Sequence, residues 1–580
     1  MRQGKNWWFL SLGFAVAGGF ILLSEPGRTS TPRTAAAQVT LGPQGELRVN
    51  GQPFLPIFVW LQPVRNFDFL ISLGINTFMG EGAQEETAKE FLDAAQARGV
   101  WGIIHSREEN WPLKGHPALL CWMFGDEPDL PAKQPYQRPV KVPRGDDGSL
   151  NIWWEGEQPA ATNISPNNWM NLTHPFLSEG KWLPGYAEEI DQEHPLWARY
   201  EVLVPEAGIY HLWVREFTKN WASPSWWRFD AGPWQHTERD LKPLELRKVH
   251  RVLSCGWVPY GQVKLSAGRH VFEVKVDEMR TAGRPEKTGQ DCMVAFDAFL
   301  LTTSDQPPLS PPRPPVPRVS PAQIAAQYRA LKAVDASHPI YLNLTAGFYE
   351  QFARYDDATY RRYCQATDIV GYDLYPVTGW GKPEWVPLIG AATRKLRALA
   401  SPRLPVWVIL ECTTKLRWVS QEHLNRIGHP QGARDFELRA MVWLAMVNGA
   451  KGIGYFPHRW DPYKQCDISE ELQAEMKRTN RQLKELAPAI LSPDAPEQVK
   501  CETREGGPVN FLTKKYQGGF YLFAVNTTRE PARVRFTLPP TVRASKVKVY
   551  DEQREIAVQR GKFEDSFGEL EVHIYFIPGE

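Results

Sequence analysis

Residues 119–129 read LLCWMFGDEPD, an apolar run that ends at once in a cluster of acidic side chains. The run Leu119–Phe124 has the length and composition of a short strand that is buried on both faces. Three carboxylates, Asp126, Glu127 and Asp129, follow within five residues of its end. The pattern predicts a buried strand whose C-terminal end carries chemically useful groups.

Seven similar apolar runs accompany this one, and helix-like stretches precede several of them. Apolar strands that alternate with helices are typical of parallel β/α units. Residues 48–130 and 316–490 together make about 260 residues, the usual size of a (β/α)8 barrel. The sequence therefore predicts an α/β fold built on such a barrel. Its expected strands are residues 54–60, 74–79, 100–104, 119–124, 340–344, 367–372, 406–410 and 452–456.

The barrel sequence is interrupted by a segment of a different kind. Two Pro-rich stretches, residues 131–143 and 306–321, have the composition of extended linkers. Between them, residues 200–214 alternate between polar and apolar side chains around a central turn, as antiparallel strands do. We expect an inserted β-sandwich over residues 145–305 and, because the alternation returns, a C-terminal β-sandwich over residues 496–580.

The first residues of the chain have the composition of a secretion signal. Arg2 and Lys5 precede a mostly apolar run over residues 7–23, and the small residues 35–37 suit a cleavage site. We expect residues 1–37 to form a signal peptide or an uncleaved N-terminal anchor. In either case the protein would be secreted, periplasmic or at the cell surface, with membrane contact only if the segment stays attached.

The composition indicates which classes of partner the protein can bind. The 67 Lys and Arg residues nearly balance 66 Asp and Glu, for a net charge of +1, so we expect no nucleic-acid partner. The 23 Trp residues, beside 19 Tyr and 27 Phe, suit stacking on sugar rings. The seven cysteines show no metal-binding spacing, and Cys255 and Cys292 either pair or remain isolated buried thiols.

Two strand ends carry the carboxylates on which a mechanism depends. In a (β/α)8 barrel, residues just past the C-terminal strand ends face the active site. Glu127 follows the fourth expected strand, and Glu411 follows the seventh. Glycoside hydrolysis by double displacement needs one protonated and one ionised carboxyl group, about 5–5.5 Å apart. The alternatives are a helix-start turn at Glu127 and a structural ion pair at Glu411.

At these residues the sequence resembles the clan A glycoside hydrolases, which are retaining glycosidases with a (β/α)8 barrel. Residues 49–57, VNGQPFLPI, resemble the first strand of many of them. The resemblance implies that Glu127 is the general acid/base and Glu411 the nucleophile. One position differs, because the clan usually has Asn where Asp126 precedes Glu127, and an ionised Asp cannot donate a hydrogen bond.

Further candidates for substrate binding lie at or near other strand ends. In the clan a Tyr after the sixth strand hydrogen-bonds the nucleophile, although either tyrosine here could instead pack in the core. The asparagine binds sugar or caps a helix, the glutamate and histidine contact substrate or are caps or surface groups, and the tryptophans are stacking platforms or core. These candidates are Asp126, Tyr372, Tyr375, Asn343, Glu81, His105, Trp60 and Trp460.

The inserted segment resembles carbohydrate-binding modules of the jelly-roll type. The stretches that carry this resemblance are residues 154–157, 205–215 and 294–301. It implies a structural Ca²⁺ held by Glu155, Glu157 and Asp297, since this ion prefers oxygen ligands. Catalysis itself is expected to need no cofactor. Because the insert leaves the barrel just after Glu127, we expect it to form one wall of the substrate cleft.

These observations predict a secreted retaining β-glycoside hydrolase that acts on a polysaccharide or an oligosaccharide. The alternative is a non-catalytic glycan-binding surface protein that keeps the barrel as a scaffold, because a fold alone does not give a function. A transglycosylase would use the same two carboxylates with a sugar as the acceptor.

Overall fold

The protein consists of two compact units, Met1–Ala132 with Pro317–Glu580, and Lys133–Val316. Residues 1–34, which hold most of the expected signal peptide or anchor, lie outside the described part of the chain. Within the described part, no helix is both long enough and apolar enough to span a membrane. The computed structural model describes residues 35–81, 85–132, 139, 141–218, 222–237, 242–250, 253–281, 290–309 and 315–578.

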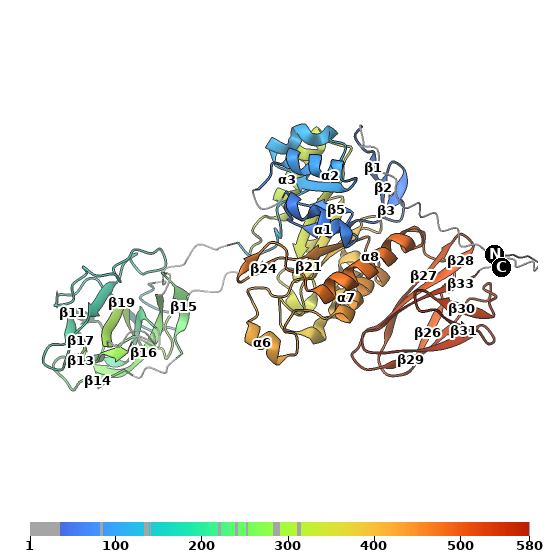
Figure 1. Cartoon of the computed structure of the whole chain (residues 1–580). Helices are drawn as coiled ribbons and strands as arrows, with labels where there is room; N and C mark the ends of the chain where they lie inside the picture. Colours follow the sequence, from blue (N-terminus) through green and yellow to red (C-terminus); the bar gives the residue numbers. More distant parts are fainter. Residues whose placement is uncertain are drawn as a thin grey trace, which may run out of the picture. The chain divides into compact units, whose positions relative to one another are not determined.

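The first unit contains a closed barrel of parallel strands (Figure 1), which confirms the predicted (β/α)8 fold. Each barrel strand overlaps one of the eight expected apolar runs, so the alternation of strands and helices was sufficient to find them. The strands are β4 (Ile57–Trp60), β5 (Thr77–Met79), β6 (Trp101–His105), β7 (Leu119–Met123), β20 (Ile340–Thr345), β21 (Ile369–Leu374), β22 (Val406–Glu411) and β23 (Gly452–Phe456).

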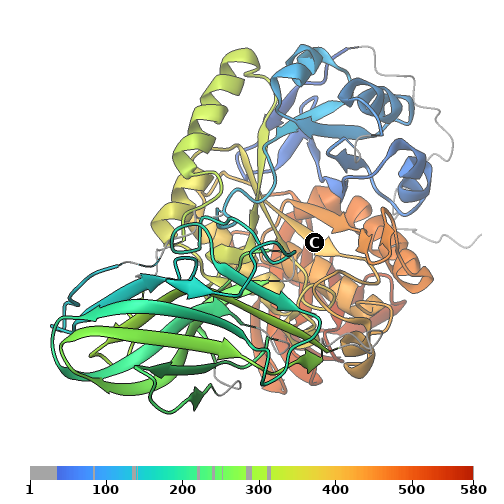
Figure 2. The ribbon, with the colours of Figure 1, turned by 90° about the vertical axis from the view of Figure 1, so that its left-hand side faces the viewer.

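Helices cover the outside of this barrel, and Figure 2 shows the long helix α3 at its edge. Helix α3 starts where Ser320 caps it and Pro321 takes the first position, a local sequence that favours a helix start. The α-helices in the described part of this unit are α1 (Phe67–Ser72), α2 (Ala88–Ala97), α3 (Pro321–Val334), α4 (Asp357–Cys364), α5 (Leu388–Leu399), α6 (Gln421–Arg426), α7 (Asp435–Val447) and α8 (Glu470–Ile490).

Aromatic rings fill the barrel interior. The Trp407 ring lies 5.4 Å from Phe58 and 5.3 Å from Tyr341, measured between ring centroids. Glycines on the inward faces of neighbouring strands leave room for these rings: a Cβ at Gly371 would meet Tyr341 at 2.0 Å, and one at Gly454 would meet Phe58 at 2.2 Å. The barrel interior below the C-terminal strand ends is therefore closely packed.

A β-sandwich at the end of the chain packs against the barrel helices. The Phe523 ring on β28 (Gly519–Asn526) stacks on Trp443 of α7 at 5.5 Å, so one face of the sandwich joins a hydrophobic cluster of the barrel, while the sandwich interior has a cluster of its own. A small sheet, β1 (Val39–Leu41), β2 (Leu47–Val49) and β3 (Gln52–Phe54), precedes the barrel. The two sheets of the sandwich are β26 (Lys500–Glu505), β29 (Ala532–Thr537) and β32 (Lys562–Phe567), and β27 (Val509–Tyr516), β28 (Gly519–Asn526), β33 (Val572–Ile577), β30 (Lys546–Val549) and β31 (Arg554–Ala557).

The second unit is the inserted β-sandwich, with a core of its own. Cys255 and Cys292 are both buried here and are not joined by a disulfide, the pairing that the sequence left open. One sheet contains β10 (Leu183–Ala187), β19 (Gln290–Thr302), β12 (Gly208–Phe217), β16 (Ser254–Leu265), β15 (Leu244–Lys248), β8 (Asn151–Glu155) and β18 (Arg280–Thr281). The other contains β14 (Gln235–His236), β13 (Trp226–Phe229), β17 (Gly268–Val276), β11 (Leu196–Val204) and β9 (Ala161–Thr162).

Candidate functional site

The turn after β7 holds Glu127 in an unusual backbone conformation. Glu127 has a φ of 47°, in the left-handed region that non-glycine residues rarely adopt. The Arg318 guanidinium fixes this turn by donating to the carbonyl oxygens of Asp126 and Glu127, the latter at 2.9 Å. Residues held in rarely populated backbone conformations cluster at functional sites.

Asp129 anchors the same turn to the next barrel strand. Its buried carboxylate accepts hydrogen bonds from the Thr345 backbone at 2.9 Å and from the Thr345 hydroxyl at 2.6 Å. The Tyr360 hydroxyl adds a third donor at 3.3 Å. Asp129 thus ties the end of β7 to the end of β20, and its charge lies close to the Glu127 carboxyl group.

Two predicted substrate-binding residues meet across these strand ends. Asn343 Nδ2 donates to Asp126 Oδ1 at 3.0 Å, and Asn343 Oδ1 accepts from the Tyr341 hydroxyl at 2.9 Å. These bonds fix the orientation of the Asn343 amide and leave the half-buried Asp126 carboxylate beside Glu127. Burial raises the pKa of Asp126, although the hydrogen bond from Asn343 opposes the rise.

Glu127 shares a hydrogen bond with Asp373, a residue of β21. Burial raises the pKa of Glu127 to about 7, and the neighbouring charges of Asp126 and Asp129 add to the rise. The hydrogen bond with Asp373 acts in the opposite direction on Glu127. Asp373 itself has a pKa well above its usual value, first from burial and then from the charge of Glu127. The shift favours the protonated form of Asp373, which is the form that can donate a hydrogen bond to the Glu127 carboxylate.

The two tyrosines predicted near the sixth strand face opposite sides of it. Tyr375 lies in the interior cluster of the barrel, and its hydroxyl bonds to Asp373. Tyr372 packs outward, where its hydroxyl donates to the Ile389 carbonyl of α5 at 2.8 Å. The structure thus places Tyr372 outside the barrel interior and brings Tyr375 and Asp373 to it. Sequence reasoning favours the tyrosines over Asp373, but the two-residue alternation of a strand groups Asp373 with Gly371 and Tyr375.

Glu411 lies at the end of β22, in register with Phe456 of β23. Its carboxylate is fully buried and accepts hydrogen bonds from the backbone of Val377 at 2.7 Å and of Thr378 at 2.5 Å, and from the Thr378 hydroxyl. Burial raises the pKa of Glu411 to about 7 in spite of these donors. The loop after β21 therefore holds Glu411, whereas Asp373 contacts Glu127.

Glu81 and His105 are partners of each other. His105 Nδ1 lies 2.9 Å from Glu81 Oε2, and the His105 backbone donates to the same oxygen at 3.1 Å. Asn110 donates to the other carboxylate oxygen at 3.3 Å. Burial tends to raise the pKa of Glu81, but the contacts with His105 outweigh it and hold the pKa at about 2.

A cavity of about 550 Å³ opens beside this pair and reaches the turn after β7. Polar groups such as His105, Arg107 and Asp126 line it together with the Trp111 indole and apolar side chains such as Leu331. A space of this size and mixed lining suits a small polar ligand such as part of a sugar chain.

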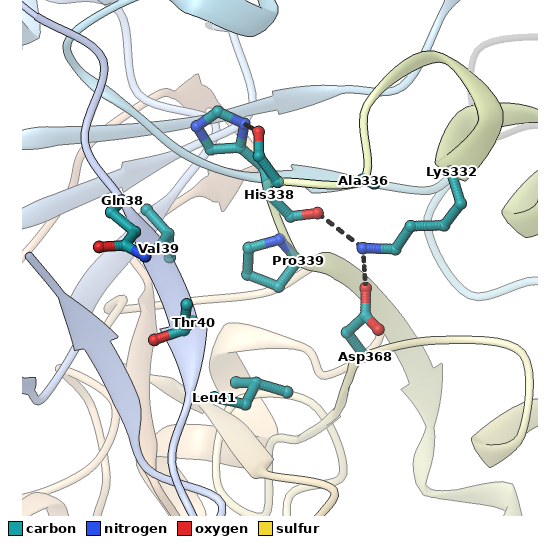
Figure 3. A pocket seen from close by; sticks show the side chains of 10 residues that line it. Gln38, Val39, Thr40, Leu41, Lys332, Ala336, His338, Pro339 and Asp368 are labelled. Atoms are coloured by element: carbon teal, nitrogen blue, oxygen red, sulfur yellow. Dashed lines mark hydrogen bonds and ion pairs between the residues drawn. The ribbon is translucent and has the colours of Figure 1, made fainter. Parts of the chain in front are cut away.

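Another cavity, of about 400 Å³, lies at the opposite end of the barrel (Figure 3). It is lined by β1 and by the residues just before β20 and β21. There Lys332 Nζ lies 2.8 Å from Asp368 and donates to the His338 carbonyl at 2.8 Å. Since the N-terminal strand ends of such barrels serve stability, we assign this cavity no catalytic role.

The two predicted aromatic platforms differ in exposure. Trp60 is only 4% exposed and belongs to the interior cluster of the barrel, so its ring serves the core. Trp460 is 40% exposed and lies in a hairpin just after β23. Of the two, only Trp460 offers a ring face to a ligand.

Two of the three carboxylates expected to hold Ca²⁺ in the insert have other partners, whereas the third, Glu157, has a buried oxygen with no hydrogen-bond partner in the described part of the chain. Asp297 accepts from the Ser178 backbone at 2.8 Å and pairs with Arg215, and both members of that ion pair are fully buried. Glu155 lies 2.6 Å from Lys141 Nζ. Across the described residues, no three His, Cys, Asp or Glu side chains are grouped to hold a metal ion. Arg215 supplies the positive charge beside Asp297, whereas burial and then the nearby charges of Glu155 and Asp297 raise the pKa of Glu157 to about 7, so the Ca²⁺ site stays a prediction.

Comparisons with known proteins give only distant similarities. No protein-family model matches the chain, and no curated protein is significantly similar to it in sequence. An α-amylase from Anoxybacillus is 11% identical with a TM-score of 0.32, over 45% of this chain and 57% of the amylase. A GH30 endoxylanase from Clostridium papyrosolvens C71 is 14% identical with a TM-score of 0.27, over 45% and 61% of the two chains. A GH42 β-galactosidase is 11% identical with a TM-score of 0.31, over 44% and 66%.

The solved structures with similar barrels thus include glycoside hydrolases. This chain spans little more than half the length of the α-amylase, and the TM-scores lie near 0.3.

Proposed function

We propose that the protein is a glycoside hydrolase in which Glu127 is the general acid/base. The observation that carries this proposal is the Glu127 carboxyl group, partly exposed at the end of β7 with a pKa of about 7. A carboxyl group with this pKa holds a proton near neutral pH and can release it to a leaving oxygen.

Asp373 supports this role without being the second reacting group. Two hydrogen-bonded carboxyl groups have oxygens about 2.5–3 Å apart. A retaining mechanism needs its two carboxyl groups about 5–5.5 Å apart, because the anomeric carbon reacts between them. We therefore assign Asp373 the task of stabilising the Glu127 carboxylate after its proton has left, by donating a hydrogen bond to it.

Glu411 is the carboxylate we propose as nucleophile. Its three hydrogen-bond donors, from Val377 and Thr378, orient the group and favour its ionised form. In the first step Glu411 attacks the anomeric carbon while Glu127 protonates the departing glycosidic oxygen. In the second step Glu127 takes a proton from water, which attacks the anomeric carbon and frees Glu411.

The test is a screen of polysaccharides and aryl β-glycosides with the wild-type protein and with Glu127→Ala, Glu411→Ala and the control Glu422→Ala, whose exposed side chain lies on α6. We expect the first two variants to lose about 10²-fold or more in kcat/KM, and the control to match wild type. NMR of the first product should show retained β configuration. Azide should restore turnover to Glu411→Ala and give a glycosyl azide of inverted configuration.

A wild-type protein that binds glycans but cleaves none would instead support the glycan-binding alternative. Transfer of the glycosyl group to an added sugar in preference to water would identify a transglycosylase, which uses the same two carboxylates.

A further inference from the structure

Two loops that follow neighbouring barrel strands bring three exposed aromatic rings together. Trp418 follows β22 and is 59% exposed, whereas Trp460 and Tyr463 follow β23 and are 40% and 50% exposed. Trp460 and Tyr463 are cross-strand partners of the hairpin β24 (Arg459–Trp460) and β25 (Tyr463–Lys464), with ring centroids 5.5 Å apart. We call Trp418, Trp460 and Tyr463 the aromatic shelf.

The shelf is connected to the candidate catalytic residues by a chain of ring contacts. The Tyr375 ring lies 5.2 Å from Phe456, Phe456 lies 4.9 Å from His458, and His458 lies 6.4 Å from Trp460. Tyr375 in turn bonds to Asp373, the partner of Glu127. Leu416, just before the exposed part of the first loop, is fully buried in the interior cluster of the barrel. The shelf therefore extends outward from the carboxylate site.

A guanidinium group lies between two rings of the shelf. Arg417 Cζ is 5.4 Å from the Trp418 ring and 5.6 Å from the Trp460 ring, so both indoles contribute cation–π attraction. The Arg417 side chain is exposed, and these flat neighbours limit the directions in which it can point. Its donors remain available to a ligand that lies on the rings.

The acidic residues of the two loops already have other partners. Asp461 lies 3.6 Å from Lys415, and Asp467 accepts from Thr414 and pairs with Lys464 at 3.0 Å. Among the residues that the structure describes, none places a carboxylate within ion-pair distance of Arg417. Burial lowers the pKa of His458, so this ring stays neutral and Arg417 provides the unpaired charge at the shelf.

We propose that the aromatic shelf binds a sugar ring carrying an anionic substituent, and that Arg417 recognises that substituent. Sugar rings stack on indoles through their apolar C–H faces. A guanidinium binds a carboxylate or a sulfate through two parallel hydrogen bonds, which a hydroxyl group cannot match. The proposal rests on the proposed function and narrows its substrate to an acidic glycan, either a uronate or a sulfated sugar.

The experiment measures binding of matched oligosaccharide pairs to the full chain carrying Glu127→Gln, which prevents turnover. One pair is a uronate oligosaccharide and its carboxyl-reduced form, and the other is a sulfated oligosaccharide and its desulfated form. Calorimetry gives the affinities, and tryptophan fluorescence reports on the shelf. We expect one acidic member to bind about tenfold or more tightly than its neutral form, with the preference falling as salt rises.

The added variants identify the group responsible. Arg417→Ala should remove the acidic preference, and Arg417→Lys should restore part of it. Trp460→Ala should weaken both members of a pair. Arg459→Ala is the matched control, since Arg459 sits in the same hairpin but pairs with Asp467 at 3.5 Å, and it should keep the preference within about twofold. Circular dichroism of each variant checks that it is folded.

The proposal is overturned if both acidic oligosaccharides bind no better than their neutral forms, or if Arg417→Ala keeps the preference. These outcomes are separate from failure of the proposed function. Cleavage of a neutral glycan that depends on Glu127 but not on Arg417 keeps the hydrolase and removes the acidic subsite. A preference for acidic oligosaccharides that depends on Arg417, with no cleavage of any glycan, keeps the acidic subsite and removes the hydrolase.

Discussion

At the scale of single residues, the two proposed catalytic carboxyl groups share nearly the same pKa. Glu411 must be ionised, so the rate should fall as pH drops below its pKa of about 7. Glu127 must be protonated, so the rate should fall as pH rises above its pKa, which is also about 7. The product of these two fractions gives a bell-shaped pH profile with its maximum near neutral pH.

Asp373→Ala should displace one limb of this profile. The mutation removes the hydrogen bond that stabilises the ionised form of Glu127, so the pKa of Glu127 should rise and the alkaline limb should move to higher pH. Asp373→Asn retains a donor and should leave that limb close to wild type. The measurement is kcat/KM against pH with an aryl glycoside. Equal profiles for all three proteins would show that Asp373 does not act through Glu127.

At the scale of strands and helices, the barrel interior sets strict limits on side-chain size. Gly371→Ala would place a Cβ 2.0 Å from the Tyr341 hydroxyl, which is held by Asn343 and cannot easily move. We expect a loss of about 1–3 kcal/mol in the free energy of unfolding, measured with urea. Gly115→Ala is the control, because nothing lies within 4 Å of its added Cβ. Equal stability of the two variants would contradict a tightly packed interior.

The same strands show what the sequence can and cannot predict. All eight barrel strands were found because each is a short apolar run next to a helix, turn or linker signal. The sequence did not show which of Tyr372 and Tyr375 points into the barrel, because both are aromatic and both faces of a buried strand are apolar. Two of the three donors to Glu411 are the backbone N–H groups of Val377 and Thr378, and a backbone donor leaves no mark in the amino-acid sequence.

In the insert, we expect the buried ion pair Arg215–Asp297 to be needed for stability. Asp297→Ala would leave a fully buried guanidinium without its partner, at a cost of about 3–5 kcal/mol in the free energy of unfolding. Glu201→Ala breaks an exposed pair with Arg269 at 3.4 Å and should cost about 0–1 kcal/mol. Because Arg215 supplies the charge beside Asp297, we expect a chelator to leave the melting temperature unchanged. A fall in the melting temperature on chelation that Ca²⁺ restores would instead support the Ca²⁺ site predicted from the sequence.

At the scale of the whole molecule, the barrel and the C-terminal sandwich are joined by buried apolar contacts. The barrel and the C-terminal sandwich share a core cluster that includes Trp443 and Phe523, beside a second cluster inside the sandwich, whereas the clusters of the insert contain insert residues alone. An ion pair also joins the two parts, since Arg529 of the sandwich pairs with Glu437 of α7. Glu437 also lies 2.9 Å from His429, so the sandwich helps to hold α7 and the segment just before it in place.

The shared core predicts that the barrel and the C-terminal sandwich unfold together. Phe523→Ala removes a ring that is 1% exposed and stacked on Trp443, and should cost about 3–5 kcal/mol. Hydrogen exchange should then accelerate in α7 and β28 alike, because each loses its packing partner. Phe69→Ala, at a ring that is 39% exposed on α1, should change exchange little. Faster exchange confined to β28 would mean that the sandwich opens alone, and that the barrel carrying Glu127 and Glu411 does not depend on it.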